Sequence, residues 1–536
     1  QAKTLFPYTT LFRSSIGANF AQGKDGELIG KDDNASERKR KYHDLTQNDY
    51  DFILISEPAF EEIDLDPVKK EEYYSSDFWV QRGESLGNAG DKRRKAIKER
   101  YEQHIAQREF SGRTDAIWFN ELGVDMLIAD EMHHQKNLYA AKARFGDQPK
   151  FLGGQGLSNR ALDFNLKTRW IREQNGGKNV HGLTATPTKN SPLEIYSMLS
   201  HIAPEAFERI HIRNSEEFLD RFCEFQQDKV LSTAGAIEDA TVVSGFKNLS
   251  ELREIMTRFI DRRTAEQVGL KLPSRDDRMH LVDMTPAQQS VYAELRELAE
   301  ESAGKKDATG DAHIFAIMDK MNKAALDLSL LDPAKHAGAN SPKYAELAKQ
   351  CLEGAKEGGQ IVFSEYIASH DKIVSALVDA GFKREEIGVI NAQVAGSSIK
   401  RQNIAEALNK GKLKVVVGNC TMAEGLNMQK TTTDIHHMDV PWEPATLQQR
   451  NGRGLRQGNM NASLRIHTYL SRGSFDGYRY QAVAAKKDWQ DMLWNGGDRV
   501  ENLSREGKFN REEMRIMLSA DPIAARAKFD EDKNEA

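Results

Sequence analysis

The sequence predicts an α/β protein in which parallel sheets are flanked by helices. Short apolar runs of strand length alternate with amphipathic stretches of helix length, which is the pattern of repeated strand and helix units. A chain of 536 residues, 39% hydrophobic and 29% charged, is too long for one core and should form two or three domains. Several apolar runs end abruptly at polar or charged residues. The carboxyl ends of strands are where open α/β sheets bind ligands.

Charge, cysteine content and hydropathy narrow the class of protein. The net charge of −6 gives no global sign of nucleic-acid binding, so any such surface must be a local basic groove. Cys223, Cys351 and Cys420 lie far apart and fit neither a zinc site nor a disulfide framework, which indicates a reducing cytoplasm. No apolar run approaches the roughly 20 residues that span a bilayer, and no signal peptide is recognisable. We therefore expect a soluble cytoplasmic protein with no membrane partner.

The first residues have an unusual composition. The chain lacks an initiator Met, and residues 4–14, TLFPYTTLFRS, look like the translation of a sequencing adapter. We expect residues 1–14 to be an artefact that lies outside the fold, which implies that natural sequence is missing upstream. The alternative is a genuine aromatic-rich edge strand.

The next hundred residues contain few signs of chemistry. Residues 26–31, GELIGK, are one residue short of the phosphate-loop pattern GxxxxGK[ST], and Asp32 follows where a hydroxyl is required. We reject this stretch as a phosphate loop. Residues 50–55 read as a buried strand, and 90–108 as a basic helix, for which a solvated face is a better interpretation than phosphate tracking.

An acidic box follows the most informative strand. The apolar run 124–129 ends at Asp130 and Glu131, and His133 lies two residues further on. In phosphoryl-transfer enzymes, the first acid of such a pair holds Mg²⁺ and the second orients or deprotonates the attacking water. Taken alone, the tetrapeptide slightly favours a strand that runs into a solvated acidic turn.

A second polar strand end lies about fifty residues later. After a predicted helix at 158–174, a short strand at 180–183 runs into Thr184, Ala185, Thr186 and Pro187. Hydroxyls at a strand end can hydrogen-bond across a cleft to the acidic box or to a phosphate. Taken alone, the stretch is a capped turn.

The rest of the chain predicts a helical segment and a second α/β unit. Residues 293–342 are mostly helical, and their apolar residues at helical spacing, from Ile314 to Leu328, indicate core or lobe packing rather than a ligand site. Strands then alternate with helices, which favours a parallel sheet with helices on both faces. We expect these strands at 360–363, 389–390, 414–418 and 434–438.

Two arginines stand out at 442–458. Arg453 and Arg456 are three residues apart, so on a helix they share one face and can point into one cleft. Two guanidiniums aimed at a γ-phosphate would neutralise charge as it develops. A basic surface helix is the less favoured alternative.

These stretches, in this order, resemble a known family. The box D130-E-M-H133 followed by L183-T-A-T-P187 is similar to motifs II and III of superfamily 2 helicases, close to the version in Swi/Snf-type DNA translocases. Residues 424–427 resemble motif V, and 442–458 resemble motif VI. The segments 259–264, 272–273 and 284–292 resemble the connection between the two motor lobes of that group. The resemblance covers most of residues 50–493.

The resemblance implies two RecA-like lobes with ATP and Mg²⁺ between them. Asp130 would hold Mg²⁺, Glu131 would orient the attacking water, and Arg453 and Arg456 would reach across from the second lobe. The remaining residues implied for coupling, for the nucleotide cleft and for the DNA track are His133, Thr184, Thr186, Gln449, Thr421, Gly425 and Asn427. Hydrolysis would advance the motor along DNA, which we expect to be double-stranded.

The same resemblance sets the expected domains. Beyond residues 1–14, we expect a partial first lobe at 15–275, a helical linker at 276–345, a second lobe at 346–495 and a charged helical tail at 496–536. The motif order is especially similar to helicase regions fused to N6-adenine methylases in large phage and plasmid antirestriction-type proteins. No Asn-Pro-Pro-Tyr-type methylase motif is present.

One feature of the family is missing from the sequence. No GxxxxGK[ST] pattern occurs in the chain. We expect a bacterial or phage ATP-dependent DNA translocase or helicase, of which this chain is a poorly active or inactive fragment. The alternative is an ATPase-dead DNA-binding or scaffolding module of a restriction, antirestriction or methylase complex.

Overall fold

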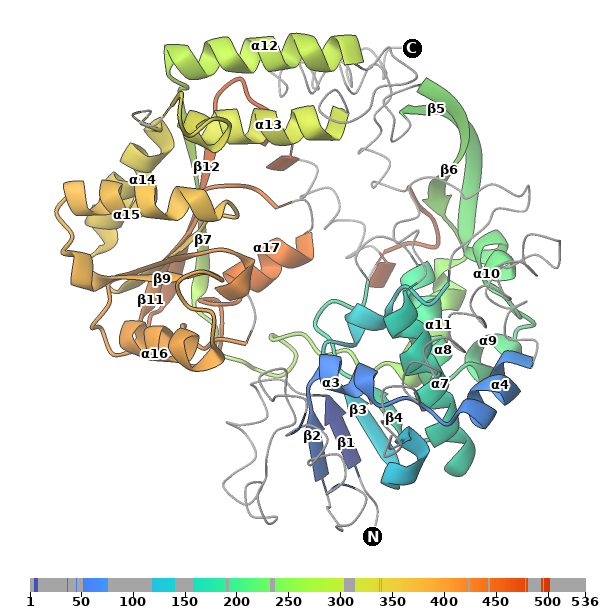
Figure 1. Cartoon of the computed structure of the whole chain (residues 1–536). Coiled ribbons are helices and arrows are strands. Elements are labelled where there is room, and N and C mark those ends of the chain that lie inside the picture. Colours follow the sequence, from blue (N-terminus) through green and yellow to red (C-terminus); the bar gives the residue numbers. More distant parts are fainter. Residues whose placement is uncertain are drawn as a thin grey trace. The chain divides into compact units, whose positions relative to one another are not determined.

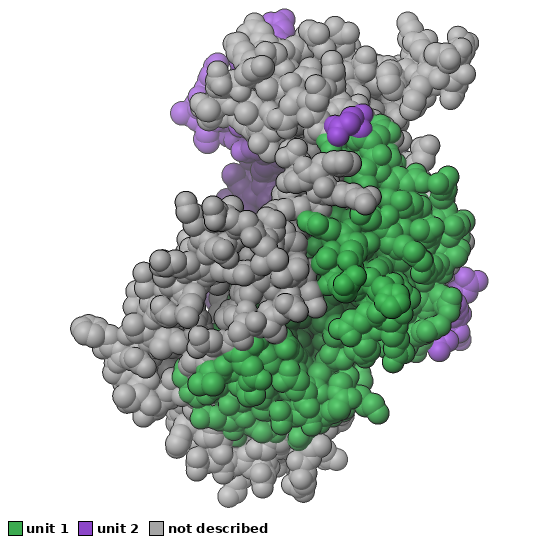
Figure 2. Space-filling model, turned by 90° about the vertical axis from the view of Figure 1, so that its right-hand side faces the viewer, with its two compact units in different colours: residues 1–226, 241–261, 492–502 green, residues 227–240, 262–491, 503–536 purple. Residues whose placement is uncertain are grey.

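The computed structural model describes part of the chain and divides it into two compact units. One unit comprises residues 1–226, 241–261 and 492–502, and the other comprises 227–240, 262–491 and 503–536 (Figure 2). The described residues are 4–7, 36, 45, 52–75, 118–139, 158–188, 192–231, 237–302, 314–336, 338, 340–422, 425–441, 444–477, 479–480, 493–494 and 496–501. The segments 26–31 and 90–108, interpreted above from sequence, lie outside these residues.

The first unit contains a parallel sheet of four strands, in the order β2-β1-β3-β4 (Figure 1). Its apolar core includes Ile53, Ile55 and Leu127 from the strands and Phe119 and Phe164 from the segments packed on them. The strands are β1 (Thr4–Pro7), β2 (Phe52–Ile55), β3 (Met126–Ala129) and β4 (Val180–Gly182). Expected strands at 50–55, 124–129 and 180–183 are thus all present, within one or two residues at each end.

The position of β1 differs from expectation. Thr4–Pro7 lies between β2 and β3, with Thr4 in register with both Phe52 and Met126. The segment is therefore an interior strand, neither outside the fold nor at a sheet edge. Its Thr-Leu-Phe sequence suits a strand, and its proline is the last strand residue. The prediction that residues 1–14 derive from an adapter concerns their origin, and this placement does not test it.

Helices complete the first unit, which also contains part of a small second sheet: residues 223–226, 241–246 and 500–501 of that sheet belong to this unit, and 227–231 and 237–240 belong to the other. Ser158 caps α7 because its hydroxyl accepts a hydrogen bond from the Ala161 amide at 3.2 Å. The helices are α3 (Glu57–Glu62), α4 (Pro67–Ser75), α7 (Asn159–Gln174), α8 (Leu193–Ile202), α9 (Glu205–Glu208), α10 (Ser215–Phe222) and α11 (Leu249–Phe259), with the 3-10 turns η2 (Phe119–Leu122) and η3 (Met132–Gln135). The small sheet has the order β13-β6-β5, from β5 (Cys223–Leu231), β6 (Ile237–Phe246) and β13 (Val500–Glu501).

The second unit is built on a parallel sheet of six strands, ordered β7-β12-β11-β8-β10-β9 (Figure 1). Every residue of β8, β9, β10 and β11 is buried. Burial on both faces explains why β9 and β10 read as continuous apolar runs and β8 as a largely apolar one, whereas β11 carries buried polar residues, among them Asp434 and His436. The strands are β7 (Ser274–Val282), β8 (Gly359–Phe363), β9 (Ile387–Ile390), β10 (Val415–Gly418), β11 (Thr432–His437) and β12 (Ser463–Ser471).

Helices cover both faces of this sheet. Along β8, Val362 packs into one apolar cluster while Ile361 and Phe363 pack into another, as the two-residue period of a strand requires. The first cluster includes residues of α14 and α15, and the second includes residues of α16. The helices are α14 (Pro342–Gly354), α15 (His370–Asp379), α16 (Ser398–Asn409) and α17 (Pro444–Asn451).

The expected linker at 276–345 packs with the second unit. All nine residues of β7 pair with β12, so β7 belongs to the sheet. Helices α12 (Pro286–Ser302) and α13 (Ile314–Leu326), with the 3-10 turn η5 (Leu328–Leu330), share an apolar cluster with Phe475. The core-packing prediction is confirmed, because Ile317, Met321 and Leu328 are buried. The unit boundaries therefore differ from the expected domains, since strand pairing with distant residues sets them.

Two further observations concern the whole set of described residues. Cys223, Cys351 and Cys420 are free thiols, the first two buried and the third exposed. Among the described helices, none combines the length and the apolar character needed to cross a membrane.

Candidate functional site

The carboxyl ends of β3 and β4 bring two polar stretches together. The strands pair in parallel with Ala129 opposite Gly182. The Leu183 amide donates to the Ala129 carbonyl at 2.7 Å, and the Met132 amide donates to the Leu183 carbonyl at 3.0 Å. The acidic box and the Thr-Ala-Thr-Pro turn, fifty residues apart in sequence, are thus neighbours at one sheet edge.

A glycine permits this close approach. A β-carbon added to Gly182 would lie 1.9 Å from the Met132 sulfur, well inside van der Waals contact. Met132 is itself 2% exposed and has no room to withdraw. A side chain at position 182 would therefore push the turn after Glu131 away from β4.

Glu131 holds an uncommon backbone conformation. Its φ of 49° and ψ of 42° lie in the left-handed region, which costs a non-glycine residue on the order of 1–3 kcal/mol. The Glu131 amide donates to the Asp130 carboxylate at 2.9 Å. The chain thus turns from strand β3 into the 3-10 turn η3 at Glu131, and both acids lie at the carboxyl end of the strand.

His133 joins the two polar stretches. Its Nδ1 lies 3.0 Å from the Thr184 hydroxyl and 3.2 Å from a Glu131 carboxylate oxygen. The ring is 2% exposed, so its orientation is fixed by packing. The Thr184 hydroxyl also accepts a hydrogen bond from the Thr186 amide at 3.1 Å. A movement of the acidic box would therefore also displace the Thr-Ala-Thr-Pro turn, because hydrogen bonds join the two.

Thr186 carries an unpaired hydroxyl. Its side chain is 8% exposed, and its Oγ1 has no hydrogen-bond partner among the described residues. Buried hydroxyls are nearly always hydrogen-bonded, so this one is suited to a ligand or ordered water. Adjacent carboxylates and hydroxyls are hard oxygen ligands of the kind Mg²⁺ prefers. The donors of the first unit therefore fit Mg²⁺ and a phosphorylated ligand.

In the second unit, helix α17 is anchored by a buried arginine that sequence reasoning missed. Arg450 is 1% exposed. Its Nη1 lies 3.0 Å from an Asp439 carboxylate oxygen, its Nη2 lies 3.1 Å from Glu365, and its guanidinium lies over the Phe363 ring at 5.3 Å. Burial raises the pKa of Asp439, but the Arg450 charge outweighs it and the net pKa is lowered. The clue available in the sequence was Asp439, an acid two residues after the end of strand β11.

The predicted helix face for Arg453 and Arg456 is wrong. Helix α17 ends at Asn451, and both arginines lie in the turns that follow. Glycine on both sides of Arg453 disfavours a helix. A β-carbon at Gly454 would lie 2.9 Å from a Leu464 methyl, so the chain passes close to β12 there. Packing against the sheet, rather than helical periodicity, decides where the arginines lie.

The two arginines have different surroundings. Arg453 donates from Nη1 to the Leu426 carbonyl at 2.6 Å and thereby holds the loop containing Gly425 and Asn427. The Arg456 guanidinium is half-buried, and it has no hydrogen bond or ion pair within the part of the chain that the structure describes. Burial alone lowers the pKa of Arg456. A half-buried, unpaired cation fits an anionic ligand such as a phosphate.

The remaining predicted residues lie in the same unit as these arginines. Thr421 follows β10 in the 3-10 turn η8 (Cys420–Met422), and its hydroxyl donates to Asn419 at 2.8 Å. Gly425 has a φ of 69°, which only glycine adopts freely. Asn427 is exposed, and the Gln449 carbonyl accepts a weak hydrogen bond from Arg453 at 3.5 Å. The loop with Gly425 and Asn427 and the helix with Gln449 are thus linked through Arg453.

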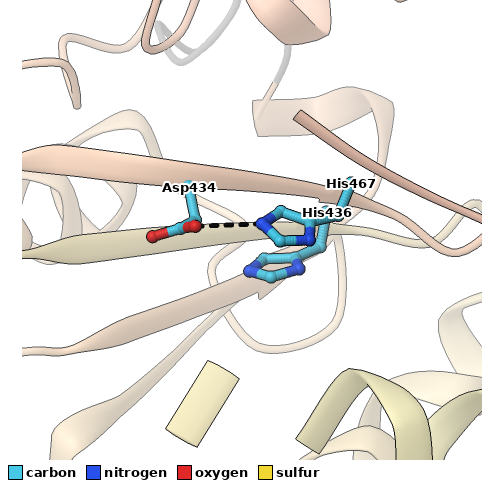
Figure 3. A group of neighbouring side chains, drawn as sticks. All are labelled: Asp434, His436 and His467. Carbon is cyan, nitrogen blue, oxygen red and sulfur yellow. Dashed lines mark hydrogen bonds and ion pairs between the residues drawn. The ribbon is translucent and has the colours of Figure 1, made fainter. Parts of the chain in front are cut away.

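A second cluster of carboxylate and imidazole groups lies inside the second sheet. Asp434, His436 and His467 place potential metal-ligating atoms within 4.8 Å of one another (Figure 3). Asp434, however, already accepts hydrogen bonds from Arg465 at 2.5 and 2.7 Å and from His467 at 3.0 Å. The guanidinium supplies the positive charge that a metal would bring. This cluster is a saturated structural network and does not fit a metal ion.

Comparisons with known proteins agree with this arrangement. The SNF2-related domain model matches residues 161–330, and the helicase conserved C-terminal domain model matches 342–458. Defense against restriction protein B of Escherichia phage P1 is 25% identical over 524 residues, which cover 72% of this chain and 23% of that protein. The Chromodomain-helicase-DNA-binding protein 3 homolog of Caenorhabditis elegans is 23% identical over 379 residues, covering 67% of this chain and 18% of that protein. The chain thus spans about a fifth of the length of these relatives.

A solved structure is also similar. The Sulfolobus solfataricus SWI2/SNF2 ATPase core in complex with dsDNA aligns with 97% of this chain and 86% of its own, at 15% identity and a TM-score of 0.34. The two matched domains follow one another in the order that the sequence motifs predicted. The acidic box follows β3 and the Thr-Ala-Thr-Pro turn follows β4. Arg453 and Arg456 follow helix α17. The chain thus contains an SNF2-related domain and a helicase conserved C-terminal domain, and these domains and the phage relative support a Swi/Snf-type superfamily 2 helicase related to antirestriction proteins.

Proposed function

We propose that this chain is the motor part of an ATP-dependent DNA translocase. The hydrogen bond between His133 and Thr184 carries the proposal, because it links the acidic box to a turn that would move with the state of a bound phosphate. Such a link is what a motor requires and what a passive acidic turn lacks. Membership of a family of ATP-dependent helicases and translocases supports the same conclusion.

Each unit would supply part of the nucleotide chemistry. Asp130 would hold Mg²⁺, which neutralises charge on the phosphates, and Glu131 would orient or deprotonate the attacking water. Arg456 would bind the γ-phosphate, since its half-buried charge has no partner among the described residues. The unpaired Thr186 hydroxyl would donate a hydrogen bond to the phosphate. Gln449, which lies on helix α17, would couple the state of the site to that helix.

The DNA side of the proposal rests on the loops after β10. Gly425 and Asn427 are exposed, and Thr421 is partly exposed, so all three are accessible to a nucleic acid. Contacts of this kind act mainly on the phosphate backbone and carry little sequence information. We propose double-stranded DNA as the track. The relatives' names, which mention restriction and DNA binding, support DNA, and an associated N6-adenine methylase region is a further proposed partner.

We further propose that the chain as printed turns over poorly. Its sequence contains no GxxxxGK[ST] pattern, whose backbone amides and lysine cradle the β- and γ-phosphates. The same observation favours the second candidate, an ATPase-dead module that clamps DNA or scaffolds a restriction or antirestriction complex. The two candidates differ in what happens once a phosphate loop is supplied.

The test is DNA-stimulated ATP hydrolysis by the chain extended upstream to include a phosphate loop. The extended protein should hydrolyse ATP only with DNA. Glu131→Gln should lower kcat by about 10²- to 10⁴-fold, and Arg456→Ala by about 10³- to 10⁵-fold. The printed chain and an exposed-site control, Glu72→Gln, accompany them. DNA binding by the extended protein without any turnover would overturn the motor proposal in favour of the binding module.

A further inference from the structure

We infer that Glu57 is a positioning residue for the acidic box, an inference that rests on the proposed function. Glu57 is the first residue of α3 and follows β2 after a single residue. Nothing in the sequence around it suggests chemistry. Its role comes from what its carboxylate contacts.

The Glu57 carboxylate binds the turn that follows Glu131. One oxygen accepts a hydrogen bond from the Gln135 side-chain amide at 2.7 Å. The other lies 3.2 Å from Nδ1 of His134. Both partners belong to η3, whose N-cap is Glu131 itself. A single side chain from the end of β2 therefore holds two residues of the turn that begins at the proposed catalytic acid.

Glu57 is suited to this role by its surroundings. Its side chain is 29% exposed, and Arg160 of α7 lies 3.5 Å from it. Burial raises the pKa of Glu57, but the His134 hydrogen bond and nearby positive charge outweigh it, and the net pKa is lowered. The carboxylate is thus charged at neutral pH and able to accept hydrogen bonds at both oxygens.

The turn needs such support because Glu131 is in the left-handed region. Strained residues persist only where their surroundings fix them from several sides. Helix α8 supplies further side-chain contacts, through a Lys136–Glu194 ion pair at 2.9 Å and through His201, whose Nε2 lies 3.0 Å from the Gln135 carbonyl. Glu57 opposes these contacts from the β2 side of the sheet. Its loss would let η3 shift toward α8 and would change the orientation of Glu131.

A matched control lies one helical turn away. Glu61 is on the same helix and pairs with the same Arg160, but its recorded ion pair does not involve η3. Glu57→Gln keeps the size of the side chain and removes its charge, while Glu57→Ala removes both. Glu61→Gln removes an equivalent charge without touching the turn.

Two readouts test the inference in the upstream-extended protein. Hydrogen–deuterium exchange should rise at least about tenfold in residues 131–136 for both Glu57 variants and stay unchanged for Glu61→Gln. With ATP and DNA, kcat should fall about tenfold to a hundredfold while KM changes less than about twofold, because a small displacement of a catalytic group acts mainly on the chemical step. The thermal unfolding midpoint is measured alongside, so that global unfolding of the alanine variant is recognised.

The two readouts separate failure of the inference from failure of the proposed function. Unchanged exchange in 131–136 would overturn the inference, as would equal effects of Glu57→Gln and Glu61→Gln on kcat. If no variant and no parent turns over ATP but exchange rises only for the Glu57 variants, the positioning role stands and the motor proposal falls. A double-mutant cycle of Glu57→Ala with Gln135→Ala should show clear non-additivity in exchange, and additivity would count against the inference.

Discussion

Two clusters of this protein contain the same kinds of side chain and differ in their surroundings: one lies at a sheet edge beside an unpartnered hydroxyl, and the other is enclosed within a sheet. At the end of β3, Asp130, Glu131 and His133 lie at a sheet edge, beside a Thr186 hydroxyl without a partner in the described chain. Within the second sheet, Asp434 and His467 are buried and hydrogen-bonded to each other, and Asp434 also accepts hydrogen bonds from Arg465. Carboxylate and imidazole groups therefore do not by themselves identify a site.

The difference teaches that a buried polar group without a partner indicates a ligand-binding site better than residue type does. A saturated buried network fixes structure, and removing one member leaves the others desolvated and unpaired. A strained turn beside an unpaired hydroxyl is suited to binding a ligand. The same contrast separates Arg450, which is buried and doubly paired, from Arg456, whose guanidinium has no partner among the described residues.

The largest effect should come from breaking the saturated cluster. Asp434→Ala leaves the buried His467 and the partly buried Arg465 without their shared partner, so the free energy of unfolding should fall by about 3–5 kcal/mol. Urea denaturation monitored in the second unit measures this. The matched control is Asp277→Ala, which removes an exposed ion pair with Arg275 and should cost less than about 1 kcal/mol. Equal losses in the two variants would contradict the contrast between the clusters.

A second effect, expressed per pH unit, should appear as a pH dependence of the stability of the second unit. Burial, followed by the Arg450 charge, lowers the pKa of His437 to about 3, and burial lowers the pKa of His436 well below its usual value. Between the unfolded pKa near 6.5 and these folded values, the unfolded chain binds more protons, so stability falls as pH falls. Each histidine should contribute a slope of about 1.4 kcal/mol per pH unit.

Urea denaturation from pH 7 to pH 4 checks this slope. His437→Asn should reduce the slope by about 1.4 kcal/mol per pH unit, the contribution of one proton, since the amide does not titrate in this range. It should also weaken the contact between His437 and Asn451, which spans 2.8 Å at the end of helix α17. A slope that is unchanged in this variant would show that His437 does not titrate as its burial predicts.

The smallest effect should come from relaxing the strained turn. Glu131→Gly adopts a φ of 49° freely, so it should be about 1 kcal/mol more stable than Glu131→Ala, which keeps the β-carbon. Neither variant retains the carboxylate, so both should lack turnover. Guanidinium denaturation of the two proteins gives the comparison. Equal stabilities would mean that the left-handed conformation at position 131 carries no strain.

The sequence alone determined the local elements and the chemistry at their ends. Apolar runs at 124–129, 360–363 and 414–418 have strand length, and the polar residues that follow them are visible without a structure. The order of these stretches also indicated the family. Local patterns are readable because they depend on neighbours within a few positions along the chain.

Only the tertiary structure decided which distant segments meet. It placed β1 between β2 and β3, joined β7 to the second sheet, and ended helix α17 before Arg453. It also revealed Glu57 beside the acidic box and Arg465 inside the buried cluster. Strand pairing and buried ion pairs depend on partners far away in the sequence, as when Val500 of β13 pairs with Phe246 of β6. A one-dimensional pattern contains no record of which of many similar strands or charges will be that partner, because packing of the whole unit makes the choice.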